Sequence, residues 1–251
     1  LEKANKNTLL ISVDNHKDSL AISRSVLDKV KNKVIIDHHR RSEEFISSPV
    51  LTYLEPSASS TVELLVELFD YQQHEIEISS LDATIMYTGM LVDTNYFRQH
   101  VGTRTFQSAA KLKEAQADLS LAYELLEDSF ECMKEIFDIT ESAYRYKDKF
   151  LIATGKDEEL SRSTLAKAAN QLVYVSGIYA AFAIGYISKN TVAISARSSK
   201  KVNVQMIMEN DALHGGGHFS MAACQIENVT IEEAKERLEH AIDAYLEDRG
   251  V

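Results

Sequence analysis

Five consecutive polar residues, Asp37-His38-His39-Arg40-Arg41, follow a short apolar stretch and could do chemistry. A carboxylate, two imidazoles and two guanidiniums crowded together would repel or desolvate one another unless an anion or a metal ion organised them. A metal ion that binds a phosphate group resolves this conflict. A mixed imidazole and carboxylate donor set suits Mn, Fe, Co or Zn, whereas carboxylates alone favour Mg. The alternative is a solvated polar loop that happens to contain paired histidines.

Two further acids, Asp14 and Asp93, also come directly after apolar segments. Taken alone, an Asp in such a place is more often a helix cap or a turn former. His16 and His100, taken alone, are interpreted as surface or supporting histidines. The three candidates support one another, because three separate predicted elements each end in a candidate metal ligand.

A second candidate site lies far along the chain, in Gly215-Gly216-Gly217-His218. Consecutive glycines can adopt positive φ and turn their N–H groups inward, which makes a nest for a phosphate or a close-fitting base. Glycine-rich turns are also commonly just turns. Arg197, at the end of a predicted strand, could clamp a phosphate because its planar guanidinium binds two oxygens at once.

The elements that must position Asp14 and Asp37 are two predicted strands, at residues 8–13 and 33–36. Both are short apolar runs of the kind found in buried parallel strands. Residues 19–30 carry apolar side chains at helical spacing, which predicts a β-α-β unit of a doubly wound sheet. In such sheets ligands bind beyond the carboxyl ends of the strands, where both acids fall.

The rest of the chain reads as helices followed by a second α/β region. The predicted helices cover residues 59–71, 81–92, 119–146 and 230–247, and the predicted strands cover residues 150–154, 178–187 and 191–196. The helix over 119–146 has no internal Gly or Pro and is expected to connect two domains. The last helix should begin with a capping box of Thr230 and Glu233.

Composition limits the kind of partner. The chain has 251 residues, 45% of them hydrophobic, and a formal charge of −11. This acidity argues against charge-driven binding of long nucleic acid but allows small anionic substrates beside a metal ion. No apolar run is long enough to span a membrane. Two cysteines, Cys132 and Cys224, are too few for a disulfide framework and favour a reducing cytoplasm.

The chain resembles the DHH/DHHA1 phosphoesterase superfamily in the Asp37 triplet, in the motifs around Asp14 and Asp93, and in the glycine-rich motif. Within it, the chain is most similar to the GdpP-type cyclic-di-AMP phosphodiesterases. The segments that carry this closer likeness are DHHRRSEEF at 37–45, EPSASST at 55–61, GTRTF at 102–106, ISARS at 194–198 and NVQ at 203–205.

The resemblance implies an α/β fold with a partial doubly wound parallel-sheet DHH domain at 1–118, a helical connector at 119–147 and a smaller mixed α/β DHHA1 domain at 148–251. It implies metal ligands at Asp14, His38 and Asp93, contact of His39 with the scissile phosphate, and orientation of a histidine by Asp37. The residues implied to grip the nucleotide are Arg197, Gly215, Gly216, Gly217 and His218. The implied cofactor is Mn²⁺ in a two-metal site, and the implied reaction is hydrolysis of cyclic-di-AMP to pApA.

One departure from the superfamily is large: its members carry an early His-x-x-x-Asp-x-Asp motif, and this chain has none. We therefore expect the chain to be cut within the DHH domain, with an incomplete metal site and impaired activity. His214, where these enzymes often have another glycine, is a smaller departure. The open sheet edge left by such a cut predicts a homodimer.

Two other functions stay open. One is a nanoRNase-like enzyme that acts on short linear oligonucleotides such as pApA, and the other is a nucleotide-binding module without catalysis. GdpP-type proteins are membrane-anchored, so the resemblance implies a soluble, cytoplasmic portion of such a protein, with no membrane contact of its own.

Overall fold

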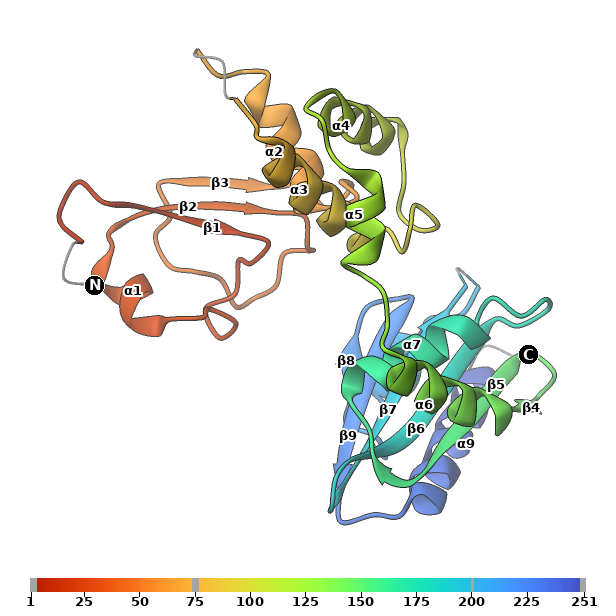
Figure 1. Ribbon diagram of the computed structural model, residues 1–251. Helices are drawn as coiled ribbons and strands as arrows, with labels where there is room; N and C mark the ends of the chain where they lie inside the picture. The colour runs from red at the N-terminus through yellow and green to blue at the C-terminus, as the bar shows by residue number, and fades with distance from the viewer. Residues whose placement is uncertain (1–3, 74–76, 200, 249–251) are drawn as a thin grey trace. The chain divides into compact units, whose positions relative to one another are not determined.

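The computed structural model describes residues 4–73, 77–199 and 201–248, which form two compact units, Leu1–Glu127 and Asp128–Val251 (Figure 1). Each unit has its own sheet and its own hydrophobic clusters. The units are therefore described one at a time.

The first unit contains a three-stranded parallel sheet in the order β1-β2-β3. Its strands are β1 (Leu9–Val13), β2 (Asn32–Asp37) and β3 (Leu51–Leu54). Both predicted strands are present, and β3 is an addition that the sequence did not reveal. Because the strands are parallel, their carboxyl ends meet at one edge of the sheet.

The helices of this unit are α1 (Arg24–Lys29), α2 (Thr61–Phe69), α3 (Ser80–Asp93), α4 (Thr103–Glu114) and α5 (Leu119–Glu124). Helices α1 and α2 pack on opposite faces of the sheet, whereas α3, α4 and α5 pack on α2 or on one another. Successive residues of β2 point to opposite faces. Ile35 packs against Leu27 of α1, and Ile36 packs against Leu64 of α2.

The second unit contains a six-stranded mixed sheet in the order β4-β5-β6-β7-β9-β8. Its strands are β4 (Tyr144–Tyr146), β5 (Phe150–Glu159), β6 (Ala180–Ser188), β7 (Thr191–Ser198), β8 (Gly216–Gly217) and β9 (Met221–Glu227). Of these strands, β5 and β6 pair in parallel and the other pairs are antiparallel, and a turn at residues 189–190 joins β6 to β7.

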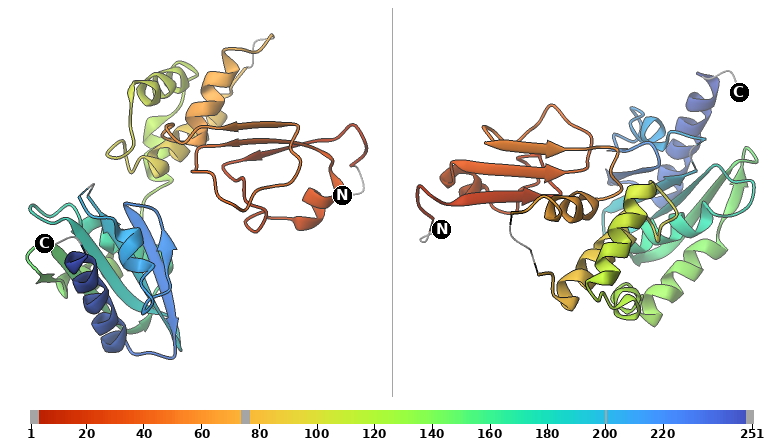
Figure 2. Two further views of the ribbon diagram at one scale, coloured as in Figure 1. Left: turned by 180° about the vertical axis from the view of Figure 1, so that it is seen from behind. Right: turned by 90° about the horizontal axis from the view of Figure 1, so that it is seen from above.

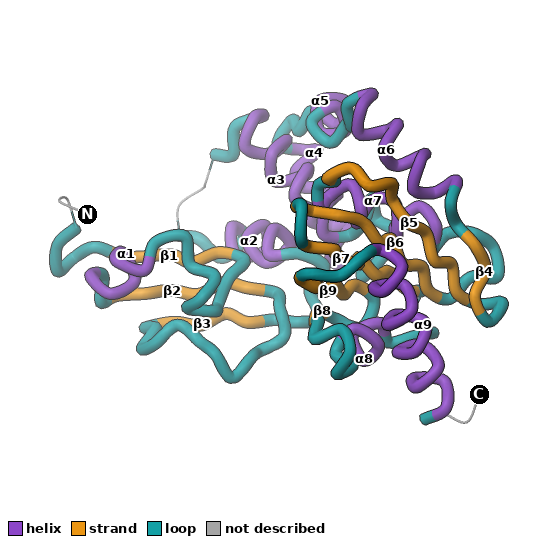
Figure 3. Tube along the Cα trace, turned by 90° about the horizontal axis from the view of Figure 1, so that it is seen from below, coloured by secondary structure: helices purple, strands orange, loops and turns teal. Residues whose placement is uncertain are grey.

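Two hydrophobic clusters lie on opposite faces of the mixed sheet. The helices that cover it are α6 (Phe130–Glu141), α7 (Arg162–Leu172), α8 (Val204–Met208) and α9 (Ile231–Glu247). Phe182 of β6 faces α8 and α9, and its neighbour Ala183 faces α6 and α7. Figure 2 shows α9 across the sheet as seen from behind, and Figure 3 shows α8 beside β8 and β9. The capping box at Thr230 and Glu233 starts α9 as predicted.

The prediction of one helix over residues 119–146 was wrong. The segment forms α5, α6 and then the strand β4. Ser129 interrupts the helical pattern, because its side chain accepts a hydrogen bond from Cys132 N and so caps a new helix. The chain therefore passes from the first unit to the second between α5 and α6.

The helix predicted over residues 19–30 is also shorter than expected, since α1 covers only Arg24–Lys29. Glu44 keeps the first residue of the predicted helix, Ser19, out of it. Its carboxylate accepts hydrogen bonds from the backbone N and the hydroxyl of Ser19, at 2.5 and 2.8 Å, and holds that residue outside the helix.

The predicted fold class is confirmed, because a parallel α/β sheet and a mixed α/β sheet occupy separate domains. Among the residues that the structure describes, no helix is both long enough and apolar enough to cross a membrane.

The two cysteines should differ sharply in reactivity. Cys224 in β9 is only 4% exposed, and burial raises the pKa of its thiol to about 12, whereas Cys132 is half-buried. The thiolate is the reactive form, so a Cys132→Ser variant should resist alkylation at pH 8 until the second unit unfolds. Mass spectrometry of the alkylated protein over time measures this. Rapid labelling of Cys224 in the folded variant would contradict the packing of β9.

Candidate functional site

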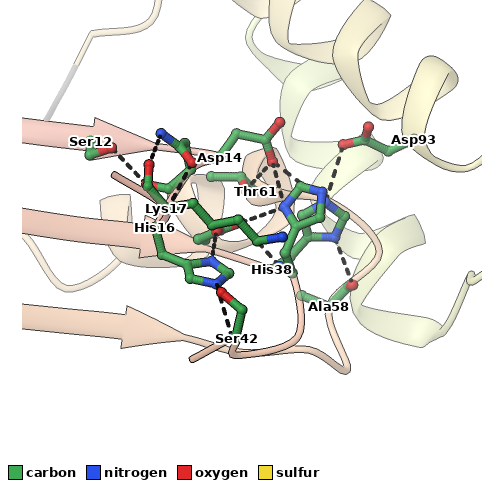
Figure 4. Close-up of polar contacts among 12 residues, drawn as sticks. Ser12, Asp14, His16, Lys17, His38, Ser42, Ala58, Thr61 and Asp93 are labelled. Carbon is green, nitrogen blue, oxygen red and sulfur yellow. Dashed lines mark hydrogen bonds and ion pairs between the residues drawn. The ribbon is translucent and has the colours of Figure 1, made fainter. Parts of the chain in front are cut away.

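The polar residues singled out in the first unit meet at the carboxyl edge of the parallel sheet. Asp14 follows β1, His38 follows β2, and Asp93 is the last residue of α3. In Figure 4 these three side chains point toward one another. His38 Nε2 lies 3.5 Å from Asp14 Oδ1 and 3.9 Å from Asp93 Oδ2. The predicted convergence of three elements is present in the structure.

The imidazole of His38 is oriented by its other nitrogen. Nδ1 lies 3.4 Å from the carbonyl oxygen of Ala58, and because a carbonyl oxygen only accepts, Nδ1 is the donor in this long hydrogen bond. A proton on Nδ1 leaves the lone pair on Nε2, the atom that faces Asp14 and Asp93. This is the arrangement in which a neutral histidine binds a metal ion.

Asp14 is held in an uncommon backbone conformation, with φ of 59°. Its backbone N–H donates to Ile36 O at 2.9 Å, and Thr61 Oγ1 donates to its carboxylate at 2.8 Å. Asp tolerates the left-handed region better than most residues, and such conformations persist where the surroundings fix them. The fold therefore sets the direction of this carboxylate.

Asp37 is 0% exposed and joins two histidines. Its Oδ1 accepts hydrogen bonds from His39 Nδ1 at 2.7 Å and from His39 N at 3.0 Å, and its Oδ2 accepts from His16 Nδ1 at 2.5 Å. Burial alone would raise the pKa of the Asp37 carboxyl, but the hydrogen bonds from His39 and His16 hold it well below its usual range. The hydrogen bond to Asp37, in turn, raises the pKa of His39.

His16 is a functional neighbour that sequence reasoning underestimated. It is buried, and its Nε2 accepts a hydrogen bond from Ser42 N at 3.3 Å, which leaves the proton on the nitrogen that faces Asp37. Its nearness to Asp14 in sequence was the available signal, but nothing local indicated the contact with Asp37. The chain forms a polar row of His16, Asp37 and His39.

The donor set fits a divalent metal ion. Burial raises the pKa of the Asp93 carboxyl to about 6, against the opposing effect of His38, and the charge of Asp14 adds to the rise. A cation placed among these groups would remove the repulsion between the two carboxylates. Donor atoms of Asp14, His38 and His39 lie within 4.8 Å of one another. Because His39 Nδ1 is bonded to Asp37, its Nε2 is the nitrogen that can face a ligand.

The candidate binding residues of the second unit lie on β7 and in and around β8, the two strands on either side of β9. Arg197 of β7 is opposite Met221 of β9, and Gly217 of β8 is opposite Ala222 of β9. At the usual spacing between strands, the backbones of β7 and β8 are about 10 Å apart. Burial lowers the pKa of the Arg197 guanidinium, and its Nη1 donates to Ala196 O at 2.9 Å.

The glycine-rich motif forms strand β8, and no helix follows it. A Cβ on Gly215 would lie 2.5 Å from Ala223 O, and one on Gly217, with φ of +150°, would lie 2.4 Å from Met221 O. Close packing on β9 therefore explains these two glycines. A Cβ on Gly216 would meet nothing within 4 Å, so the open side of the motif is there. His214, with φ of 49°, takes a conformation that suits glycine better.

His218, the last residue of the glycine-rich motif, is exposed like Gly217 before it. Its backbone N–H donates to Met221 O at 2.7 Å, which closes the turn between β8 and β9, and its side chain is exposed.

Replacing Asp37 by Asn should lower the pKa of His39, because the negative charge that stabilises the imidazolium is lost. In the unsubstituted chain, the stabilisation from this pair should be complete below pH 6.5, the ordinary pKa of His39, and should disappear as the pH rises through its raised value. Histidine NMR titrations measure the shift. Asp93→Asn is the matched control, since Asp93 has the weaker effect on His39, and an equal shift in both variants would contradict the assignment.

Residues 2–90 match the DHH family, N-terminal domain, and residues 147–248 match the DHHA1 domain. The chain is 44% identical over 246 residues to the protein named cyclic-di-AMP phosphodiesterase PdeA of Listeria monocytogenes, and 42% identical over 250 residues to that named cyclic-di-AMP phosphodiesterase GdpP of Bacillus subtilis. Both matches cover 98% of this chain but only 37% and 38% of the relatives' lengths.

Among solved structures, an exopolyphosphatase-related protein from Bacteroides fragilis is similar in fold. The TM-score is 0.82 at 21% sequence identity, and the match covers 94% of this chain and 71% of that one. This likeness supports the fold.

Proposed function

We propose that this chain, which belongs to the DHH family and carries a DHHA1 domain, is the catalytic part of a metal-dependent phosphodiesterase that hydrolyses cyclic-di-AMP to pApA. The observation that carries the proposal is the convergence of Asp14, His38 and Asp93 at one edge of the parallel sheet. The names of the two relatives at 42% and 44% identity support the substrate. Since the chain spans less than two fifths of each relative, the activity is proposed for the longer protein.

In this proposal Asp14, His38 and Asp93 hold the metal ion. Manganese is the proposed ion, because the donors combine imidazole with carboxylate. When bound, metal ions in such a site supply an activated water and neutralise charge on the phosphate. Asp14 and His38 belong to a cluster of donor atoms that lie within 4.8 Å of one another, and Asp93 Oδ2 lies 3.9 Å from His38 Nε2. These three ligands are proposed for one ion of a two-metal site.

His39 acts on the substrate side of the site. Asp37 orients the ring and favours its protonated form, so that Nε2 can donate a hydrogen bond to a phosphate oxygen of the scissile bond. His16 Nδ1 donates a hydrogen bond to Asp37 Oδ2 and so holds the Asp37 carboxylate in place. The hydrogen bonds from His16 to Asp37 and between Asp37 and His39 thus keep the protonated His39 ring in one position.

The second unit is proposed to grip the nucleotide. The guanidinium of Arg197 can bind phosphate oxygens, while the open side of Gly216 lets a ligand approach the backbone. Gly215, Gly217 and His218 shape the turn that carries it. The net charge of −11 supports a small nucleotide as ligand and opposes long nucleic acid.

Two further properties belong to the same proposal. The unpaired cysteines Cys132 and Cys224 suit a cytoplasmic location, where the two domains would be part of a membrane-anchored protein. A homodimer is supported by exposed apolar side chains on the edge strand β1, namely Leu9, Ile11 and Val13, which are 50%, 53% and 49% exposed.

The test is hydrolysis of cyclic-di-AMP and of pApA, with Mn²⁺ or with a chelator, followed by chromatography of the products. A chimera should be assayed beside the chain, with the residues that precede the matched region in the Listeria relative joined ahead of Leu1. We expect Mn²⁺-dependent conversion of cyclic-di-AMP to pApA, faster in the chimera. Cleavage of pApA alone would favour the nanoRNase-like function, and binding of nucleotide without cleavage would favour a non-catalytic module.

Two substitutions in the chimera separate metal binding from substrate binding. His38→Ala should lower kcat/KM about 100-fold or more, because a metal ligand is lost. Arg197→Ala should raise KM about tenfold with a smaller effect on kcat, because a charge-assisted hydrogen bond to substrate is lost. The exposed His240 of α9 provides a control, and His240→Ala should leave both constants unchanged. Full activity of the His38→Ala variant would refute the metal assignment.

A further inference from the structure

Two of the segments that carry the likeness to cyclic-di-AMP phosphodiesterases, EPSASST at 55–61 and GTRTF at 102–106, contain none of the metal or substrate residues proposed above. In the structure they meet. The first leads into α2, the second begins α4, and the buried carboxylate of Glu63 in α2 lies between them.

Glu63 is 2% exposed, and several donors surround it. Its Oε2 accepts hydrogen bonds from Ser59 Oγ at 2.6 Å, from Ser59 N at 3.3 Å and from Thr105 Oγ1 at 2.8 Å. The guanidinium of Arg104 adds an ion pair, with Nε 3.6 Å from Glu63 Oε1. A buried carboxylate is stable only with such compensation, so these contacts fix one another.

The position of Glu63 in α2 makes these contacts unusual. It is the third residue of the helix, where a Glu commonly reaches back to the backbone N–H of the capping residue. The capping residue here is Ser60, yet Glu63 bonds instead to Ser59, one residue earlier, and to Thr105 of another helix. It therefore fastens the segment ahead of the helix to α4.

That segment, residues 58–61, supports two of the proposed metal ligands. The carbonyl of Ala58 accepts the hydrogen bond that orients His38, and the hydroxyl of Thr61 donates to Asp14 at 2.8 Å. Both supporting groups are within three residues of Ser59. A shift of residues 58–61 would therefore disturb both ligands together.

We propose that Glu63 is a positioning residue, which holds residues 58–61 through Ser59 and α4 through Thr105, so that Ala58 and Thr61 keep His38 and Asp14 in the geometry that binds a metal ion. The proposal rests on the metal-binding function proposed above. Glu63 itself contacts neither of the two ligands; it acts through the segment that does.

The first test is Mn²⁺ affinity, measured by calorimetry on variants of the whole chain. Glu63→Gln and Thr61→Val should each weaken Mn²⁺ binding about tenfold, as loss of groups that orient metal ligands typically does. Thr61→Ser keeps the hydroxyl and should retain the affinity of the unsubstituted chain. Equal losses in Thr61→Ser and Thr61→Val would overturn the role of the hydroxyl.

Glu67→Gln is the matched control. Glu67 lies one turn further along α2 and binds Arg104 through two hydrogen bonds of 2.6 Å, and its described side-chain hydrogen bonds and ion pair do not involve residues 58–61. Its substitution should leave Mn²⁺ affinity unchanged. Unchanged affinity in Glu63→Gln as well would overturn the proposal, and so would an equal loss in Glu67→Gln.

A second readout needs no metal. The ¹⁵N chemical shifts of His38 should report a proton on Nδ1 in the unsubstituted chain and a mixture of the two tautomers in Glu63→Gln, because the Ala58 carbonyl is no longer held in place. If the unsubstituted chain bound no Mn²⁺, the proposed metal function would fail while this readout still tested the positioning. An unchanged tautomer in Glu63→Gln would overturn the role of Glu63.

Circular dichroism and thermal unfolding should accompany every variant, so that only folded protein is compared. If Glu63→Gln does not fold, Ser59→Ala and Thr105→Val test the same contacts, since each removes one donor and leaves the carboxylate partly bonded. Both should weaken Mn²⁺ binding and mix the tautomers of His38. Normal results in both would overturn the proposal.

Discussion

The polar site of the first unit depends on one buried negative charge, the carboxylate of Asp37. A charge without solvent requires donors, and here they come from His39 just beyond β2 and from His16 just beyond β1. The hydrogen bonds to Asp37 therefore hold the loop after β1 beside the loop after β2 without a bound ligand. The same parallel sheet that supplies Asp37 also positions Asp14, whose backbone N–H donates to Ile36 O in β2.

Much of this arrangement could be predicted from sequence, because it follows from a few strong rules. The strands β1 and β2 are apolar runs that end in acids, and parallel strands place their carboxyl ends at one edge. The nearness of Asp14 and His38 follows from that rule, whereas Asp93 comes from the end of a helix, α3. Periodicity was less reliable where a local cap decided the outcome, since Ser129 starts a new helix inside a pattern that continues unbroken. Strand β9 was missed because its inward residues are mainly small.

The supporting residues of the site could not be predicted, for a different physical reason. His16 and Asp37 are 21 positions apart, and Glu63 and Thr105 are 42 positions apart. Such contacts form only when the loops or helices that carry them are folded against each other, and no local pattern encodes them. The same limit applies to the glycine-rich motif. Its sequence indicated a ligand nest, whereas two of its glycines are required by close packing on β9.

The mixed sheet of the second unit ends on both sides in very short strands, the three-residue β4 and the two-residue β8. A long free edge is a template on which other chains can form cross-β aggregates, and short edge strands are a common protection against this. The short length of β8 thus has a consequence for ligand binding as well. The unit can present backbone to a small ligand at β8 without offering a strand long enough for another polypeptide to pair with.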